Sequence, residues 1–121
     1  MKPLDWIGPT RRELRQFPEA VRDAVGFALF RAQLGSKHPS ATPLKGFGGA
    51  GVLEIVEDHD GDTYRAVYTV RFTEAVYVLH VFQKKSKKGI ATPKHELERI
   101  RARLKQAERR HEEYLKGGRQ P

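Results

Sequence analysis

The chain has 121 residues and a formal net charge of +8, with 38% hydrophobic and 31% charged residues. This length allows one domain with one modest core. The absence of cysteine excludes disulfides, thiolate metal sites and cysteine nucleophiles. No apolar run approaches the roughly 20 residues of a membrane span, and residues 1–7 lack the plan of a signal peptide. We therefore expect a cytoplasmic protein without a membrane partner.

The excess of positive charge is confined to the last third of the chain. Residues 1–83 contain ten Lys/Arg and ten Asp/Glu, whereas residues 84–121 contain thirteen and five. A concentrated basic field favours a polyanion or an acidic protein as partner. The alternative for the C-terminal residues is a solvated basic helix with a frayed tail.

The N-terminal third predicts a short strand over residues 4–7 and a helical module. Thr10 and Glu13 have the spacing of a capping box at the start of a first helix. Phe17-Pro18 interrupts this helix, and Pro18 suits the first turn of a second one that Gly35 ends. The apolar stripe of the second helix consists of Val21, Val25, Leu29 and Ala32.

The remaining residues predict a loop, three strands and a last helix. The predicted strands are Val52–Glu57, Tyr64–Phe72 and Val76–Lys84. Asp60-Gly61 is a strong hairpin signal between the first two, and Thr73-Glu74 is a weaker turn. Thr92-Pro93 is expected to start the last helix as cap and first residue, and Gly117-Gly118 to end it. The apolar seam of that helix is Leu97, Ile100, Leu104, Ala107, His111 and Tyr114.

These elements predict an α+β fold with two N-terminal helices, an antiparallel β-meander sheet and a C-terminal helix. We expect a single domain over residues 1–121. Its parts are a strand and helical module (1–35), a loop (36–51), the meander (52–85), the C-terminal helix (92–116) and a tail (117–121).

The first hairpin places two charged residues on one face of the sheet. A two-residue Asp60-Gly61 loop pairs positions whose numbers sum to 121, so that Arg65 faces Val56. Because side chains alternate along a strand, Glu54 then shares a face with Arg65.

The second hairpin leaves two registers open. A two-residue turn pairs positions that sum to 147 and adds His80 and Lys84 to the face of Arg65. A three-residue turn instead brings Lys85 to that face and turns His80 away.

Residues of these types suit the cleavage of RNA, which carries its own nucleophile in the 2′-OH group. Arg65 can clamp a phosphate in a bidentate manner. Glu54 or a lysine can act as the base, and a lysine or His80 as the acid. A structural Glu54–Arg65 pair and a packed His80 are the alternatives.

The most basic stretch has four lysines in five residues, at Lys84, Lys85, Lys87 and Lys88. Such a run can neutralise several phosphates, although lysines also protect sheet edges. The acidic residues 58–62 do not match a calcium loop, because Thr63 replaces its glycine and Thr69 its glutamate. The histidines have no paired ligand spacing, and we expect neither a metal nor a cofactor.

The segments Tyr64–Tyr68 and Val78–Pro93 resemble the phage-derived, HigB-like branch of the RelE/ParE toxins. Leu44-Lys45-Gly46 and Val52–Ile55 fit the same pattern, and the similarity extends from about Leu4 to Tyr114. The part from His80 to Pro93 is the specific one.

This resemblance implies a type II toxin of RelE-like fold that cleaves mRNA, usually on the translating ribosome. Its partner would be a cognate antitoxin, often in this branch a helix-turn-helix protein like HigA. Arg65 matches the arginine on the superfamily's central strand, and Lys84 and Lys85 match its basic residues at the end of the last strand. We expect RNA or ribosome contacts from Lys45, Lys87, Lys88 and Lys94. A ParE-like inhibitor of gyrase and a non-catalytic nucleic-acid-binding module are the competing functions.

Overall fold

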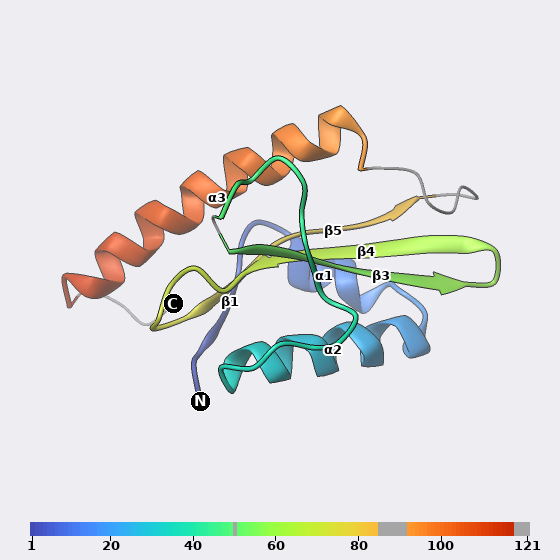
Figure 1. Ribbon diagram of the computed structural model, residues 1–121, viewed down its shortest axis with the longest axis horizontal. Helices are drawn as coiled ribbons and strands as arrows, with labels where there is room; N and C mark the ends of the chain where they lie inside the picture. Colours follow the sequence, from blue (N-terminus) through green and yellow to red (C-terminus); the bar gives the residue numbers. More distant parts are fainter. Residues whose placement is uncertain (50, 85–91, 118–121) are drawn as a thin grey trace.

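The computed structural model describes residues 1–49, 51–84 and 92–117. A five-stranded sheet forms the middle layer, with α2 against one face and the long α3 across the other (Figure 1). No helix within these ranges is both long enough and apolar enough to span a membrane. The elements are β1 Leu4–Trp6, α1 Thr10–Arg15, α2 Glu19–Gln33, β2 Thr42–Pro43, β3 Val52–His59, β4 Asp62–Thr69, β5 Val76–Lys84 and α3 Lys94–Leu115.

The expected α+β class is confirmed, and the sheet is larger than the predicted meander. Its strand order is β1-β5-β4-β3-β2. The predicted antiparallel meander of β3, β4 and β5 is extended at one edge by β1, which pairs in parallel with β5. At the other edge, β2 pairs with β3 inside the region expected to be a loop. β2 has two residues, and its Pro43 is tolerated because the strand lies at an edge.

The first hairpin has the predicted register. Asp60 and Gly61 have φ values of 50° and 83°, which are the left-handed conformations of a type I′ turn. Arg65 lies opposite Val56 and Glu54 lies opposite Val67. Glu54 and Arg65 therefore share one face of the sheet.

The second hairpin has the predicted pairing at His80, but its connection differs from the predicted turn and it contains a bulge. The connection between β4 and β5 is longer than the expected two-residue turn, and beside it Thr69 pairs with Tyr77, one position out of the predicted register. A β-bulge then inserts Leu79 as an extra residue, so that Val67 opposes His80 as predicted. The bulge keeps His80 on the face of Arg65.

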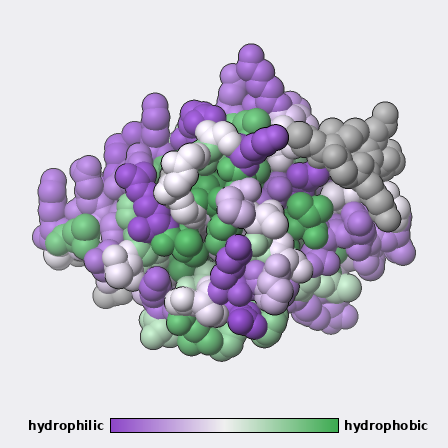
Figure 2. All heavy atoms as spheres, viewed as in Figure 1, coloured by the Kyte–Doolittle hydropathy of each residue, from purple (hydrophilic) through white to green (hydrophobic). Residues whose placement is uncertain are grey.

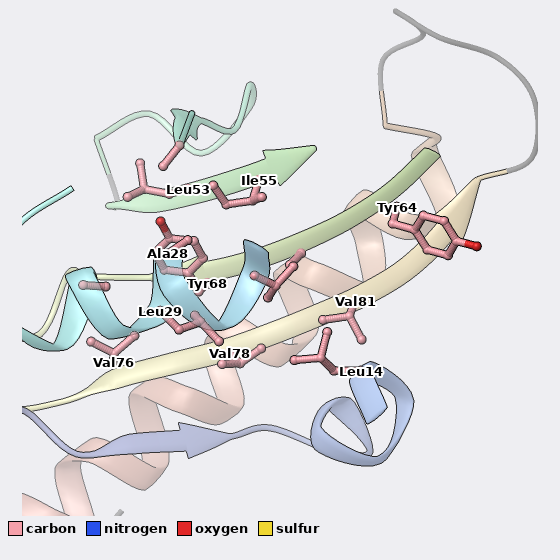
Figure 3. Close-up of a cluster of buried hydrophobic side chains, with 14 of the residues drawn as sticks. Leu14, Ala28, Leu29, Leu53, Ile55, Tyr64, Tyr68, Val76, Val78 and Val81 are labelled. Atoms are coloured by element: carbon pink, nitrogen blue, oxygen red, sulfur yellow. The ribbon is translucent and has the colours of Figure 1, made fainter. Parts of the chain in front are cut away.

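Two apolar clusters occupy the two sides of the sheet, because successive side chains of a strand point to opposite faces. On the α2 side, shown in Figure 3, the cluster includes Leu14, Val25, Leu29, Leu53, Ile55, Tyr68 and Val78. On the α3 side it includes Ile7, Phe47, Val52, Val67, Leu79, Ile100 and Leu104. Burial of both sheet faces fixes where α3 lies, and thereby what covers the charged residues of that face.

The helices begin differently from the prediction. Pro9, Pro18 and Pro93 occupy the N-cap positions of α1, α2 and α3, and no side chain caps these helices. The predicted capping box is wrong, because Thr10 is the first residue of α1. The predicted cap of α3 is also wrong, because Thr92 precedes Pro93 and uses its hydroxyl elsewhere. In each case the proline carbonyl accepts the first helical hydrogen bond, and the proline ring restricts the backbone there.

The predicted ends of the last two helices are confirmed. Gly35 follows α2 with φ 85° and donates to the carbonyl of Ala32, while the amide of Ser36 donates to Arg31. This pair of bonds is the Schellman motif. Gly117 follows α3 with φ 81° and donates to Tyr114.

Candidate functional site

Glu54, Arg65 and Thr92 are joined by three mutual hydrogen bonds between the sheet and the start of α3. Nη1 of Arg65 donates to Oε2 of Glu54 over 3.0 Å and to Oγ1 of Thr92 over 3.2 Å. The Thr92 hydroxyl donates to the same Glu54 oxygen over 2.9 Å. The side chains of Arg65 and Glu54 are only 7% and 11% exposed. The arginine expected to clamp phosphate is thus buried and bonded to a carboxylate.

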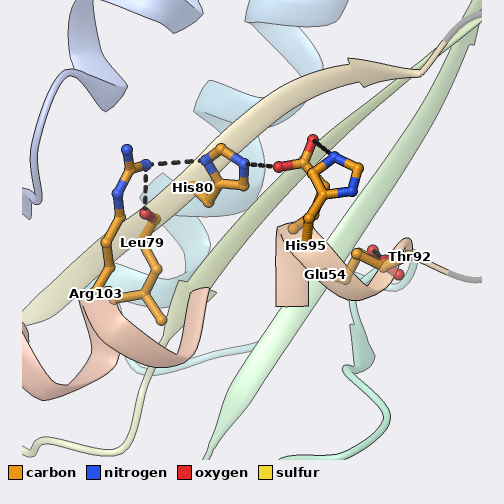
Figure 4. A network of polar contacts seen from close by, with 7 residues as sticks. Glu54, Leu79, His80, Thr92, His95 and Arg103 are labelled. Atoms are coloured by element: carbon orange, nitrogen blue, oxygen red, sulfur yellow. Dashed lines mark hydrogen bonds and ion pairs between the residues drawn. The ribbon is translucent and has the colours of Figure 1, made fainter. Parts of the chain in front are cut away.

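His80 lies beside this cluster and contacts α3 through both ring nitrogens (Figure 4). Its Nε2 is 2.8 Å from Oε1 of Glu96, and its Nδ1 is 2.9 Å from Nη1 of Arg103. Because a guanidinium only donates, Nδ1 must accept, and Nε2–H donates to the Glu96 carboxylate. Arg103 also donates to the carbonyl of Leu79 over 3.1 Å. These contacts fix the neutral tautomer of His80 with the proton on Nε2.

The environment of His80 favours the neutral ring. Burial lowers the pKa of His80 below its ordinary value, and the positive charges of Arg103 and Arg99 lower it further. The hydrogen bond and the charge of Glu96 oppose this shift without reversing it. The ring also stacks on Phe82, with centroids 4.9 Å apart. His80 therefore suits the positioning of α3 on the sheet better than the donation of a proton near pH 7.

A shallow hollow of about 340 Å³ opens beside His80. It lies between α1, β5 and the first turn of α3. Its lining residues are Glu13, Gln16, Phe17, His80, Val81, Phe82, Gln83, Glu96 and Arg99. This mixture of charges makes the hollow poorly suited to a phosphate.

The structure describes three of the six predicted lysines. Lys84 pairs with Thr63 at the end of β5, on the face that carries Arg65. Lys94 is exposed at the start of α3, two residues after Thr92. Lys45 is also exposed, but it lies in the loop between β2 and β3. Lys85, Lys87 and Lys88 lie outside the described residues.

A second polar chain lies toward the other end of α3. The Tyr77 hydroxyl is 2.8 Å from Nδ1 of His111, whose Nε2 is 2.8 Å from Oε1 of Glu74. A carboxylate only accepts, so Nε2–H donates to Glu74, and in the neutral ring Nδ1 accepts from the Tyr77 hydroxyl. Burial, together with the neighbouring Asp5 carboxylate, raises the pKa of Tyr77 to about 12. The helical spacing predicts His111 only as part of an apolar seam, and the polar role of its ring comes from the tertiary structure.

Sequence reasoning missed the partners that α3 contributes to the site. Glu96 and Arg103 are seven residues apart, which places them on one face of a helix, and this face covers β5. That spacing of opposite charges was the available signal. Within the described residues, no group of three or more histidine or acidic side chains is arranged to hold a metal ion.

Comparisons with known proteins agree with this fold. Two solved structures resemble the chain: a double arginine-to-alanine mutant of the E. coli toxin RelE in the free state, and the isolated E. coli RelE toxin. The first has a TM-score of 0.50 and 22% identity over 66% of this chain and 80% of the other. The second has a TM-score of 0.52 and 20% identity over 84% and 98%. These values show a shared fold.

No significant match is found among curated proteins. The sequence profile of the family described as "Phage derived protein Gp49-like (DUF891)" matches residues 12–105. The expected RelE-like fold is thereby confirmed, while the HigB-like branch is not singled out. The chain belongs to the family of phage-derived Gp49-like proteins.

Proposed function

We propose that the protein is the toxin of a type II toxin–antitoxin pair and cleaves mRNA on the ribosome. Two facts support the proposal: the fold is that of RelE, which is described as a toxin, and the whole positive excess lies in residues 84–121. The similarity of residues 80–93 to HigB-like toxins points the same way. A neighbouring antitoxin, with a helix-turn-helix domain, is the proposed protein partner.

The observation that carries the proposal is the position of Arg65 between two lysines. Lys84 lies opposite Thr63, two residues from Arg65 on the same face, and such diagonal neighbours are about 7–8 Å apart. Lys94 follows Thr92, which is bonded to Arg65. Arg65 and Lys84 lie on the face that also carries the carboxylates of Glu54 and Asp58, and Lys94 adds a third cation at the start of α3 beside Thr92. Such a cluster stabilises the charge that develops on a phosphate during cleavage.

In the proposed reaction the 2′-OH of the RNA attacks the neighbouring phosphorus, and the bond to the 5′ oxygen breaks. The scissile phosphate replaces Glu54 as the anion bonded to Arg65. Glu54 then accepts the proton of the 2′-OH, and Lys84 or Lys85 protonates the leaving 5′ oxygen. His80 acts through α3, because Glu96 and Arg103 engage both of its nitrogens.

The other lysines are assigned to docking. Lys45, Lys87, Lys88 and Lys94 are proposed to contact phosphates of the mRNA or the ribosome. Such contacts release counterions and make binding dependent on salt. They carry no sequence information, so codon preference would come from other groups.

Primer extension on mRNA after brief induction of the full chain tests the function. The proposal expects discrete cuts with 5′-hydroxyl ends, since the 5′ oxygen leaves with a proton. Arg71→Ala is a matched control, because Arg71 is an exposed arginine paired with Glu108 and should leave the cuts unchanged. Intact mRNA together with broken chromosomal DNA would replace this function by gyrase poisoning. Intact mRNA and DNA would leave a binding module.

A further inference from the structure

The outward face of α2 is apolar where a surface helix is normally polar. Phe27, Phe30 and Leu34 follow at helical spacing and are 50%, 42% and 56% exposed. The opposite face of the same helix already supplies the core with Val25 and Leu29. Figure 2 shows apolar atoms along the lower edge of the molecule, where Figure 1 places α2. A contiguous group of exposed large apolar side chains indicates an interaction surface.

The central residue of this face is held in place. The Phe27 ring packs edge-on against His38, with centroids 5.5 Å apart. The guanidinium of Arg31 lies 5.8 Å from the centre of the same ring. A side chain that is already ordered loses little conformational freedom when a partner covers it.

The charges on this face are arranged symmetrically about Phe27. Asp23 lies four residues before Phe27 and Arg31 four residues after it, and residues four apart form one ridge along a helix. When two copies of this ridge meet antiparallel about a twofold axis, positions whose numbers sum to 54 face each other. Asp23 of each copy then faces Arg31 of the other, and the two Phe27 rings meet at the centre. Among the described residues, no ion pair joins Asp23 to a side chain of its own chain.

In the same twofold arrangement, large side chains of one copy face small side chains of the other. In that arrangement Phe30 faces Ala24 of the other copy, and Leu34 faces Ala20. Ala20 is exposed and Ala24 is partly exposed, so both leave room for a large side chain. The large side chains of one copy thus meet small ones of the other, which leaves room for the two helices to approach each other.

We propose that α2 is the interface of a twofold-symmetric homodimer. A twofold interface uses the same patch on both subunits and must be complementary to itself. The face of α2 meets this requirement in charge and in size, which a surface for an unrelated partner does not need to do. The basic residues of α3 lie on the other side of the sheet from α2 (Figure 1). Two copies joined through α2 therefore keep their main positive charges apart.

The interface is small, which sets the strength of the expected dimer. A helix of 15 residues is about 22 Å long, and a contact along one such helix belongs to the class of small, transient interfaces. We therefore expect a dissociation constant in the micromolar range rather than an obligate dimer. The basic, RNA-facing side of each subunit would remain accessible in the dimer.

Sedimentation equilibrium of the purified full chain, between about 1 and 500 µM, tests the proposal. The wild type should pass from monomer to dimer within this range. Asp23→Lys and Arg31→Glu, each alone, place like charges against each other and should weaken the dimer at least roughly tenfold. The double variant Asp23→Lys/Arg31→Glu restores opposite charges across the twofold axis and should recover most of the affinity. Phe27→Ser should leave a folded monomer.

Two control variants separate this interface from general stickiness. Leu115→Ser removes an apolar side chain that is 59% exposed at the end of α3, and Arg22→Glu changes a charge roughly 140° around α2 from Phe27. Both should dimerise like the wild type. A wild type that stays monomeric throughout the range overturns the proposal, as does a dimer that Phe27→Ser leaves intact. A monomeric wild type whose antitoxin binding is abolished in Phe27→Ser would assign the face to that partner instead. These outcomes are independent of whether the protein cleaves RNA.

Discussion

Arg65 and Glu54 form a buried ion pair, with Nη1 of the arginine 3.0 Å from Oε2 of the glutamate. Thr92, just before α3, bonds to both side chains. The pair therefore joins the sheet to the entrance of the C-terminal helix. It also means that the arginine proposed for phosphate binding contributes to the stability of the fold.

Arg65→Ala should destabilise the protein as well as inactivate it. The substitution leaves Glu54 buried beside Thr92 without its cation, and breaking a buried ion pair in this way costs roughly 3–5 kcal/mol. The double variant Glu54→Gln/Arg65→Met removes both charges at similar volume and should recover most of that stability. Urea unfolding followed by circular dichroism measures the difference.

The same two variants separate stability from activity. Both should fail to arrest growth on induction, although only Arg65→Ala is unstable. If the stable double variant still arrests growth fully, neither Arg65 nor Glu54 takes part in catalysis.

Lys84 and Lys94 should contribute to ribosome binding through their charge. Replacing both by glutamine should weaken co-sedimentation with ribosomes and reduce the salt dependence of binding, by roughly 0.9 in the log–log slope for each phosphate that is no longer neutralised. Lys105→Gln/Lys116→Gln removes the same charge from exposed positions farther along α3 and at its C-cap and serves as the control. Equal slopes for the two double variants would make the effect one of net charge rather than of position.

His80 should make the fold less stable in mild acid. Its pKa in the folded protein is lowered, chiefly by burial, so the unfolded chain binds a proton more readily than the native one. The contribution of His80 to the free energy of unfolding is fully present above its pKa in the unfolded chain, which is about 6.5. This contribution is lost as the pH falls toward the lower pKa of the folded protein. The melting temperature should therefore drop between about pH 7.5 and about pH 5.5.

His80→Gln should reduce this drop in melting temperature, because the side chain no longer titrates. His95→Gln is the matched control, since the His95 side chain is 75% exposed and should leave the pH dependence unchanged. The same drop in wild type and His80→Gln would rule out His80 as its source.

Tyr77→Phe should cost roughly 1–3 kcal/mol of stability, because it leaves Nδ1 of the buried His111 without its donor. Tyr68 provides the comparison. Burial raises the pKa of both tyrosines to about 12, but the Tyr68 hydroxyl has no hydrogen-bond partner among the described residues. Tyr68→Phe should therefore be nearly neutral in thermal unfolding. Equal destabilisation in the two variants would show that the hydrogen bond between Tyr77 and His111 does not contribute to the stability of the fold.

The charged face of the sheet was predictable because it depends on local chemistry. An Asp60-Gly61 turn adopts the type I′ conformation through its own backbone preferences, and strict alternation then puts Glu54 and Arg65 on one face. The register at His80 was predicted correctly, although the prediction assumed a two-residue turn and no bulge. The bulge at Leu79 offsets the longer connection, and a bulge depends on packing that no pattern in β5 announced.

The sequence by itself determined the fold class, the first hairpin, the end of α2 and the placement of the positive charge in residues 84–121. These depend on turn chemistry, periodicity and composition, which act over a few residues. Only the tertiary structure decided that Thr92 covers Arg65, and that Glu96 and Arg103 take both nitrogens of His80. Those contacts join residues 16–27 positions apart. They exist because α3 must bury its apolar seam against the sheet, and the position of that seam sets which polar groups meet.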